Sequence, residues 1–255
     1  MTAKVQPPSH TAAVNGHGPV GVLFGVLVGA VMATAFSWVF SIIIEVVGMN
    51  TIWKDTGVFH ARQLVLDDLR YIENAPHSVI VPDTVAFARD MASYVALPFV
   101  KLGVVGLYER AHSTAAGPAA TAGKKLAAPA ALSGLSAWMT RMWSLLGMIA
   151  LYTAQDTALR LAIVVLALPA FVLACLLGAV DGLVRRDLRK WGGGRESSFV
   201  YHHAKATTYL SLGGGFSLYL SWPGGGFNPA HMVLVFTVLV AWGLSLTLSS
   251  FKKYL

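Results

Sequence analysis

The amino-acid sequence predicts an all-α membrane protein with about four transmembrane helices and a helical periplasmic insertion between the first and the second. Three observations support this prediction. Only 12% of the residues are charged, whereas soluble domains carry about 25%. Several apolar runs are close to the about 20 residues that a helix needs to cross the hydrocarbon core. Basic residues gather in a short segment between such runs, which is typical of cytoplasmic loops in membrane proteins.

The first predicted span is residues 20–44, which follow a mobile tail at 1–19 and contain no charged residue. The length of this run favours an uncleaved signal anchor over a cleaved signal peptide. Three glycines recur every four residues within it, and such a stripe lets a second helix approach closely. We therefore expect helix packing through Gly21, Gly25 and Gly29.

Residues 45–157 are predicted to form a helical region outside the membrane, because their acidic and basic side chains balance. Asp83 stands where it can cap the start of a helix. Residues 112–133 are rich in Ala, Gly, Pro and Thr and are predicted to be a linker. The apolar stretch 135–152 is expected to lie along the membrane surface or to pack within this region, because Arg141 in its middle opposes insertion.

Three further spans are predicted in the second half of the chain, at residues 161–180, 206–222 and 230–251. The middle one contains three consecutive glycines, each of which weakens a helix by about 1 kcal/mol relative to Ala. Close contact with a neighbouring helix and a break that lines a pathway both explain such a sequence. We favour contact, and we assign a helix-packing role to Gly213, Gly214 and Gly215.

The densest group of charges lies between the second and third spans, at residues 181–205. Its first half continues the second span as a helix, the glycines after Trp191 end that helix, and a new cap follows. We predict a basic cytoplasmic hairpin that contacts anionic lipid headgroups and docks a partner protein. The residues expected to form this docking surface are Arg185, Arg186, Arg189, Lys190, Arg195 and Glu196.

The distribution of charge also predicts the orientation. Four alternating spans place residues 181–205 and the basic end at 252–255 on the same side of the membrane. Because Lys and Arg are enriched on the cytoplasmic side, we expect both termini in the cytoplasm of a bacterium and the 45–157 region in the periplasm. The chain is thus expected to be a multi-pass protein of the inner membrane.

Residues with catalytic or ligand-binding spacing are scarce. Cys175 is the only cysteine, and His202 and His203 are adjacent, so their rings diverge on a helix. HExxH and GxSxG motifs are absent from the sequence. We therefore expect no catalytic residue, no cofactor, no metal site and no enzymatic activity. Asp156 and Asp181 lie at the two ends of the second predicted span, and no span has an ionisable residue in its middle, which disfavours proton-coupled transport.

The run VDGLVRRDLRKWGGGRESSFVYHHAK follows an apolar span with an internal proline. It resembles a family of inner-membrane proteins encoded on integrating conjugative elements of proteobacteria, and the likeness covers most of residues 20–255. The resemblance implies a place in the inner-membrane apparatus for conjugative DNA transfer, beside a coupling ATPase. It implies no enzymatic activity.

We therefore expect a non-enzymatic inner-membrane accessory component of a conjugative, type IV secretion-like machine. The basic hairpin is expected to dock a cytoplasmic protein, with the coupling ATPase as the candidate, and the spans are expected to contact lipid, other helices or a second copy of the chain. Sequence-specific binding of nucleic acid is not expected, because a short loop makes few phosphate contacts. Two alternatives stay open: a transporter or channel subunit that uses the Gly-rich third span, and an entry-exclusion factor that acts through the periplasmic region.

Overall fold

The computed structural model describes residues 19–75, 78–113, 130–192, 203, 206, 210–222 and 228–250. Within these ranges the chain is helical and contains no strand, which confirms the predicted all-α class. Four helices of the described chain are long and apolar enough to cross a membrane, at Leu27–Thr51, Gly134–Leu166, Leu168–Trp191 and Pro229–Ser249. The count agrees with the expectation of about four spans, but among the described residues Gly134–Leu166 is one of the four and the predicted span 206–222 is not. The periplasmic placement of the insertion stays a prediction.

The chain divides into two units, Met1–Met32 and Ala33–Leu255. Helix α1 (Pro19–Thr51) crosses this division, so only its second half belongs to the larger unit. The features described below lie in that larger unit. Gly21, Gly25 and Gly29 lie in the first unit, and their role in helix packing stays a prediction.

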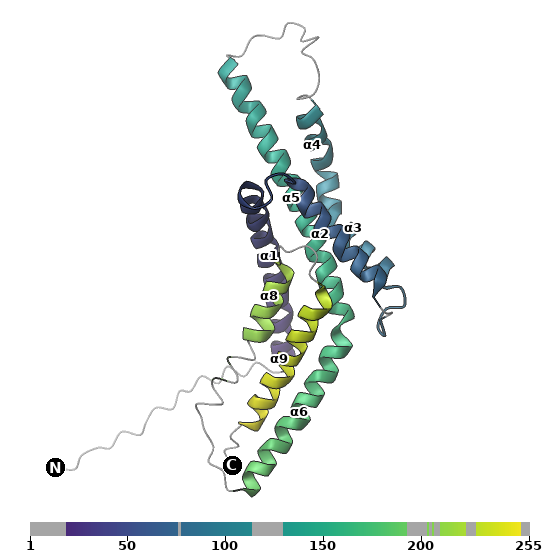
Figure 1. Cartoon of the computed structure of the whole chain (residues 1–255), viewed down its shortest axis with the longest axis vertical. Helices are drawn as coiled ribbons and strands as arrows, with labels where there is room; N and C mark the ends of the chain where they lie inside the picture. Colours follow the sequence, from purple (N-terminus) through teal and green to yellow (C-terminus); the bar gives the residue numbers. More distant parts are fainter. Residues whose placement is uncertain are drawn as a thin grey trace, which may run out of the picture. The chain divides into compact units, whose positions relative to one another are not determined.

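Helix α5 (Ala130–Leu166) is the central element of the larger unit (Figure 1). Helices α2 (Val58–Asn74), α3 (Thr84–Lys101) and α4 (Val104–Ser113) pack along it. One core cluster joins α2, α3 and α5 through side chains that include Ile72, Ala88 and Leu159. In the most apolar 18-residue stretch of α5, 61% of the residues are buried, whereas in that of α6 only 11% are buried. Apolar residues of α5 therefore build the protein core, and those of α6 are available to lipid.

Helices α6 (Leu168–Trp191) and α9 (Pro229–Ser249) form a closely packed pair. Two glycines of α6 make this possible. A Cβ atom at Gly178 would lie 3.0 Å from Cα of Ala241, and one at Gly182 would lie 2.7 Å from the carbonyl oxygen of Ser245. Because no side chain intervenes, the two backbones come into direct contact, which is how helices associate in lipid.

The predicted span 161–180 does not begin where it was expected. Helix α5 continues to Leu166, Ala167 interrupts it, and α6 begins at Leu168 with Pro169 in its first turn. A proline is tolerated at that position because the first amide groups of a helix have no intrahelical partner. The sequence 161–180 is therefore shared between two helices. The stretch 135–152 is part of the long helix α5, in which residues 134–143 are exposed and burial begins at Ser144.

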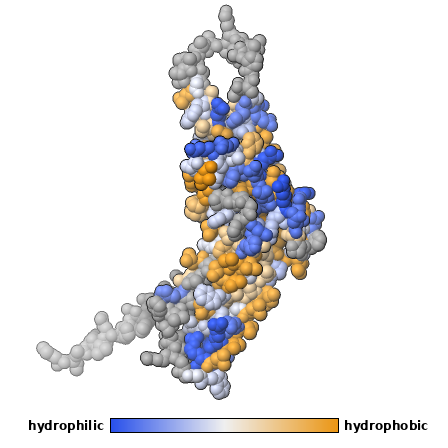
Figure 2. Space-filling model, viewed as in Figure 1, coloured by the Kyte–Doolittle hydropathy of each residue, from blue (hydrophilic) through white to orange (hydrophobic). Residues whose placement is uncertain are grey.

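The third predicted span, 206–222, is described from Leu210 onward apart from Ala206. Residues Leu210–Gly214 form one turn of π-helix, and α8 (Gly215–Leu220) follows it directly. The helix is thus widened and not broken at the glycines. In Figure 2 hydrophobic side chains gather over the part of the molecule that contains α6 and α9, and hydrophilic side chains gather over α2 and α3.

Candidate functional site

The most unusual feature of the fold is a buried ionic cluster centred on Arg160, near the end of α5. Its side chain is only 4% exposed. Nε lies 3.0 Å from Oδ2 of Asp68 in α2 and 3.2 Å from Oδ2 of Asp156, one turn earlier in α5. Nη1 donates hydrogen bonds to the backbone carbonyls of Tyr219, at 3.2 Å, and of Trp222. One guanidinium group therefore joins α2, α5 and the end of α8.

A hydrogen-bonded pair, His60 with Glu45, lies beside this cluster, where α1 turns into α2. Nδ1 of His60 is 3.0 and 3.2 Å from the two carboxylate oxygens of Glu45. The His60 ring stacks on the indole of Trp53, with ring centroids 4.1 Å apart. Trp53 fits there because Gly48 has no side chain. A Cβ at Gly48 would overlap the indole ring. The corner between α1 and α2 thus buries the Glu45 carboxylate, which is 3% exposed as a residue.

A small cavity connects the two groups. It is lined by Glu45 and Asp156 together with the hydroxyl-bearing residues Ser41, Thr153 and Ser221. Its volume is about 10 Å³, which is close to the least space that holds one water molecule. Oδ1 of Asp156 has no hydrogen-bond partner among the described residues. Ala61, Leu64 and Trp222 complete the lining, so one small occupant would meet carboxyl and hydroxyl groups as well as apolar side chains.

This cluster corrects one expectation from the sequence. The predicted spans were expected to lack ionisable residues at depth, but Glu45, Asp156 and Arg160 all lie inside helices of membrane-spanning length and are all buried. The error came from the assumed helix boundary, because the predicted second span began at residue 161 and left Asp156 and Arg160 outside. Their spacing of four residues in an apolar helix is the signal that could have revealed an ion pair.

The basic end of α6 is the second candidate site, and the structure shows how its first half is held. Nε of Arg185 lies 2.8 Å from Oδ2 of Asp181, one turn earlier. The same Asp181 oxygen accepts a hydrogen bond of 2.5 Å from the Ser245 hydroxyl of α9. Nη2 of Arg189 donates to the Ser249 carbonyl, also at 2.5 Å, at the C-terminal end of α9. A cation is favourable there because the last carbonyls of a helix carry partial negative charge.

The predicted docking residues therefore differ in what they can offer a partner. Arg189 stabilises the contact between α6 and α9, and Arg186 is half-buried. Arg185 keeps 57% of its side chain exposed, and Lys190 is exposed. Helix α6 continues to Trp191 as expected, and Gly192 caps it. Arg195 and Glu196 lie outside the described residues.

The three glycines of the third predicted span also differ from one another. A Cβ at Gly215 would overlap the Phe236 ring of α9, and one at Gly214 would lie 3.3 Å from Leu210. A Cβ at Gly213 would meet no described atom within 4 Å. Close packing at this segment therefore depends on Gly215. The sequence did not single out Gly178 and Gly182, although they have the same four-residue spacing as the glycines of the first span.

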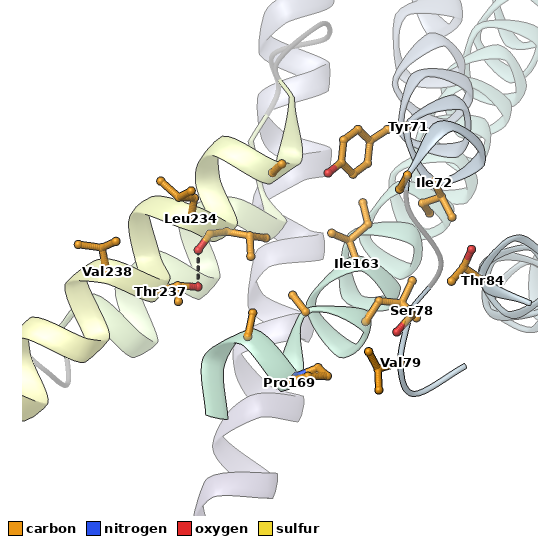
Figure 3. A pocket seen from close by; sticks show the side chains of 16 residues that line it. Tyr71, Ile72, Ser78, Val79, Thr84, Ile163, Pro169, Leu234, Thr237 and Val238 are labelled. Carbon is orange, nitrogen blue, oxygen red and sulfur yellow. Dashed lines mark hydrogen bonds between the residues drawn. The ribbon is translucent and has the colours of Figure 1, made fainter. Parts of the chain in front are cut away.

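An apolar pocket of about 550 Å³ lies where α5 gives way to α6 (Figure 3). It is bounded by the break at Ala167 and Pro169, by the α2–α3 connection around Val79, and by Leu234 and Val238 of α9. Its few polar groups are hydroxyls. Burial raises the pKa of Tyr71, so its phenol stays neutral, and the Thr237 hydroxyl donates to the Val233 carbonyl at 2.7 Å. Such a lining suits an apolar occupant and not an ionic substrate.

The fold and these sites define a multi-helix protein with membrane-length apolar helices and a buried ionic cluster between them. Within the described chain, no group of three or more His, Cys, Asp or Glu residues has the geometry of a metal site. A family model described as "IncC plasmid conjugative DNA transfer protein DtrJ-like" matches residues 52–252. The chain therefore belongs to the DtrJ-like family, and this membership implies a role in conjugative DNA transfer.

The family match confirms the association with conjugation that the sequence predicted. The more specific context, an integrating conjugative element, stays a prediction. Neither a curated protein nor a solved structure matches the chain. The matched range contains Asp68, Asp156 and Arg160 of the ionic cluster and the whole basic end of α6, whereas Glu45 precedes it.

Proposed function

We propose that this protein is a non-enzymatic accessory component of the conjugative DNA-transfer apparatus in the bacterial inner membrane. In this proposal both termini are cytoplasmic, and the basic end of α6 docks a cytoplasmic protein of the apparatus. The coupling ATPase is the candidate partner. Family membership supports the place in conjugation, and the arrangement of α6 supports the mode of docking.

The observation that carries the docking proposal is the change of character along α6. Leu173, Leu176 and Leu177 expose about 60% of their side chains in its first half, as expected for residues that face lipid. About two turns after Leu177 the helix becomes basic, at Arg185. Basic residues that directly follow an apolar span mark the cytoplasmic side of a membrane. Because α9 anchors this end through Arg189 and Ser245, Arg185 and Lys190 are presented on a fixed helix end.

The structure determines which substitutions test this proposal. Reversing Arg189 would disturb α9 as well as any partner, so the test pair is Arg185→Glu with Lys190→Glu. The matched control is Arg62→Glu with Arg70→Glu in α2, which changes the net charge equally. Arg70 is exposed and forms an ion pair with an aspartate three residues away. Arg185 likewise forms an ion pair with an aspartate four residues away.

Both double variants are expected to insert into the membrane at wild-type levels. The α6 variant is expected to lose co-purification of the coupling ATPase and to reduce DNA transfer by at least about tenfold, since each charge reversal at an interface costs about 1–2 kcal/mol or more. The α2 variant is expected to retain both properties. Normal transfer by a correctly inserted α6 variant would overturn docking at this surface.

A second candidate, a transporter or channel subunit, is favoured by one observation. Glu45, Asp156 and Arg160 supply the buried ionisable groups in membrane-length helices that such proteins use. The adjoining cavity holds only about one water molecule, which is too little for a continuous pathway in this conformation. Solute or ion flux in proteoliposomes, abolished by Asp156→Asn, would favour this candidate over the docking component.

A further inference from the structure

We infer that the Arg160 cluster is a proton-binding site. The pair Asp68 and Asp156 holds one proton, which Asp156 carries as a neutral carboxylic acid while Asp68 is ionised. The ligand of this site is a single proton at neutral pH. The inference rests on the charges that face Asp156, on the geometry around Arg160 and on the cavity beside them.

The charges do not balance if every carboxyl group is ionised. Asp156 is faced by Glu45 from α1, by His60 and Asp68 from α2, by Arg160 from its own helix and by Tyr219 from α8. Tyr219 is a neutral phenol, and His60 pairs with Glu45. Arg160 then offsets one aspartate only, and the second would be a buried charge without a counterion. Such a charge costs several kcal/mol, so the group binds a proton instead.

The geometry shows why the two aspartates act together. Both use Oδ2 to contact the same guanidinium nitrogen, Nε, at 3.0 and 3.2 Å. Two carboxylates on one site repel each other, and the usual outcome is that one ionises and the other keeps its proton.

The same contacts indicate which of the two is neutral. Asp68 makes the shorter contact, and its side chain is 11% exposed. Asp156 makes the longer contact, its side chain is 5% exposed, and its Oδ1 has no partner among the described residues. A buried charged oxygen without a hydrogen-bond partner costs more than a neutral one, so the proton is assigned to Asp156 and not to Asp68.

The cavity gives this proton a route. Asp156 and Glu45 both line it, and its volume is sufficient for about one water molecule. A water molecule in this cavity would lie between the carboxyl groups of Asp156 and Glu45, and Glu45 contacts His60, whose side chain is 17% exposed. A proton can therefore pass between Asp156 and a partly exposed histidine without movement of a helix.

The test is infrared spectroscopy of the full chain, purified in detergent and labelled with ¹³C at its aspartate carboxyl groups. The wild-type protein is expected to show, at neutral pH, a carboxylic-acid carbonyl band that shifts with the label. Asp156→Asn is expected to abolish the band. Asp68→Asn is also expected to abolish the band. Arg160 is then the counterion of Asp156 alone, so Asp156 loses its proton. Asp67→Asn, at a half-exposed neighbour of Asp68, is the control and is expected to leave the band unchanged.

Each result decides the inference. The absence of a protonated aspartate band in the wild-type protein at neutral pH would overturn it directly, without any variant. A band that persists in folded Asp156→Asn would place the proton on another group, and one that persists in folded Asp68→Asn would show that the aspartates do not share it. Circular dichroism of each variant establishes that it is folded.

Discussion

Arg160 connects residues that are distant in the sequence. Asp68 lies 92 positions before it and Tyr219 lies 59 positions after it. The side chain is buried with five donor groups, and its partners among the described residues are buried aspartates and backbone carbonyls. A cation in this position stabilises the fold only as part of its group, because without it the Asp68 carboxylate would be a buried charge with no counterion.

Arg160→Met is therefore expected to lower the free energy of unfolding by about 3–5 kcal/mol at neutral pH. The neutral triple variant, with Asp68→Asn and Asp156→Asn added, is expected to recover most of that loss, because it leaves no unpaired charge. Thermal or denaturant unfolding in one detergent measures both. Arg70→Ala, which breaks an exposed ion pair, is the control and is expected to cost at most about 1 kcal/mol. Equal losses for Arg160→Met and Arg70→Ala would contradict the structural role of the cluster.

At the scale of elements, the close packing of α6 against α9 depends on two glycines of α6. Gly178 and Gly182 bring α6 against the backbone of α9, and Asp181 and Arg189 add polar contacts at the same interface. Small residues and hydrogen bonds of this kind replace the hydrophobic drive that helices lack in lipid.

Two glycine-to-alanine substitutions separate close packing from helix propensity. Gly178→Ala is expected to destabilise the protein by about 1–3 kcal/mol, because its methyl group collides with the Ala241 backbone. Gly213→Ala has free space around the new methyl group and is expected to be neutral or to stabilise by up to about 1 kcal/mol. Unfolding in detergent measures both effects. An equal loss for the two variants would show that the α6–α9 contact does not require the glycine.

The sequence predicts most helices well but not their partners. Uncharged runs indicate the long helices, and Asp83 caps α3 as expected, with its carboxylate accepting from the Ala86 amide at 2.8 Å. Both signals are local. The pairing of Arg160 with Asp68 is not local. Without knowledge of that partner, Asp156 and Arg160 in an apolar run indicate the edge of a span. The close contacts at Gly178 and Gly215 likewise depend on a neighbouring helix, although the GxxxG spacing of Gly178 and Gly182 could have been recognised.

At the scale of the whole molecule, the charge distribution predicts one orientation. The corner between α1 and α2, around Lys54, is predicted to face the periplasm, and the end of α6, at Trp191, to face the cytoplasm. Trp191 is 91% exposed, and residue 54 is also exposed, so a cysteine at either place is accessible to reagents.

Single-cysteine variants test this orientation. With Cys175 replaced by Ser, Lys54→Cys in whole cells is expected to react with a membrane-impermeant maleimide after the outer membrane is permeabilised. Trp191→Cys is expected to react only after the inner membrane is also disrupted. Labelling in denatured samples controls for the presence of each cysteine. Labelling of both residues from the same side would contradict the predicted topology.

The central claim, that the basic end of α6 docks the coupling ATPase, is tested most directly by site-specific photocrosslinking in donor cells. A photoreactive amino acid at position 190 is expected to form a crosslink with that ATPase, and the same amino acid at position 62 in α2 is expected to form none. Crosslinks to the ATPase from position 62 but not from position 190 would contradict docking through α6, as would the failure of both positions in cells that transfer DNA normally.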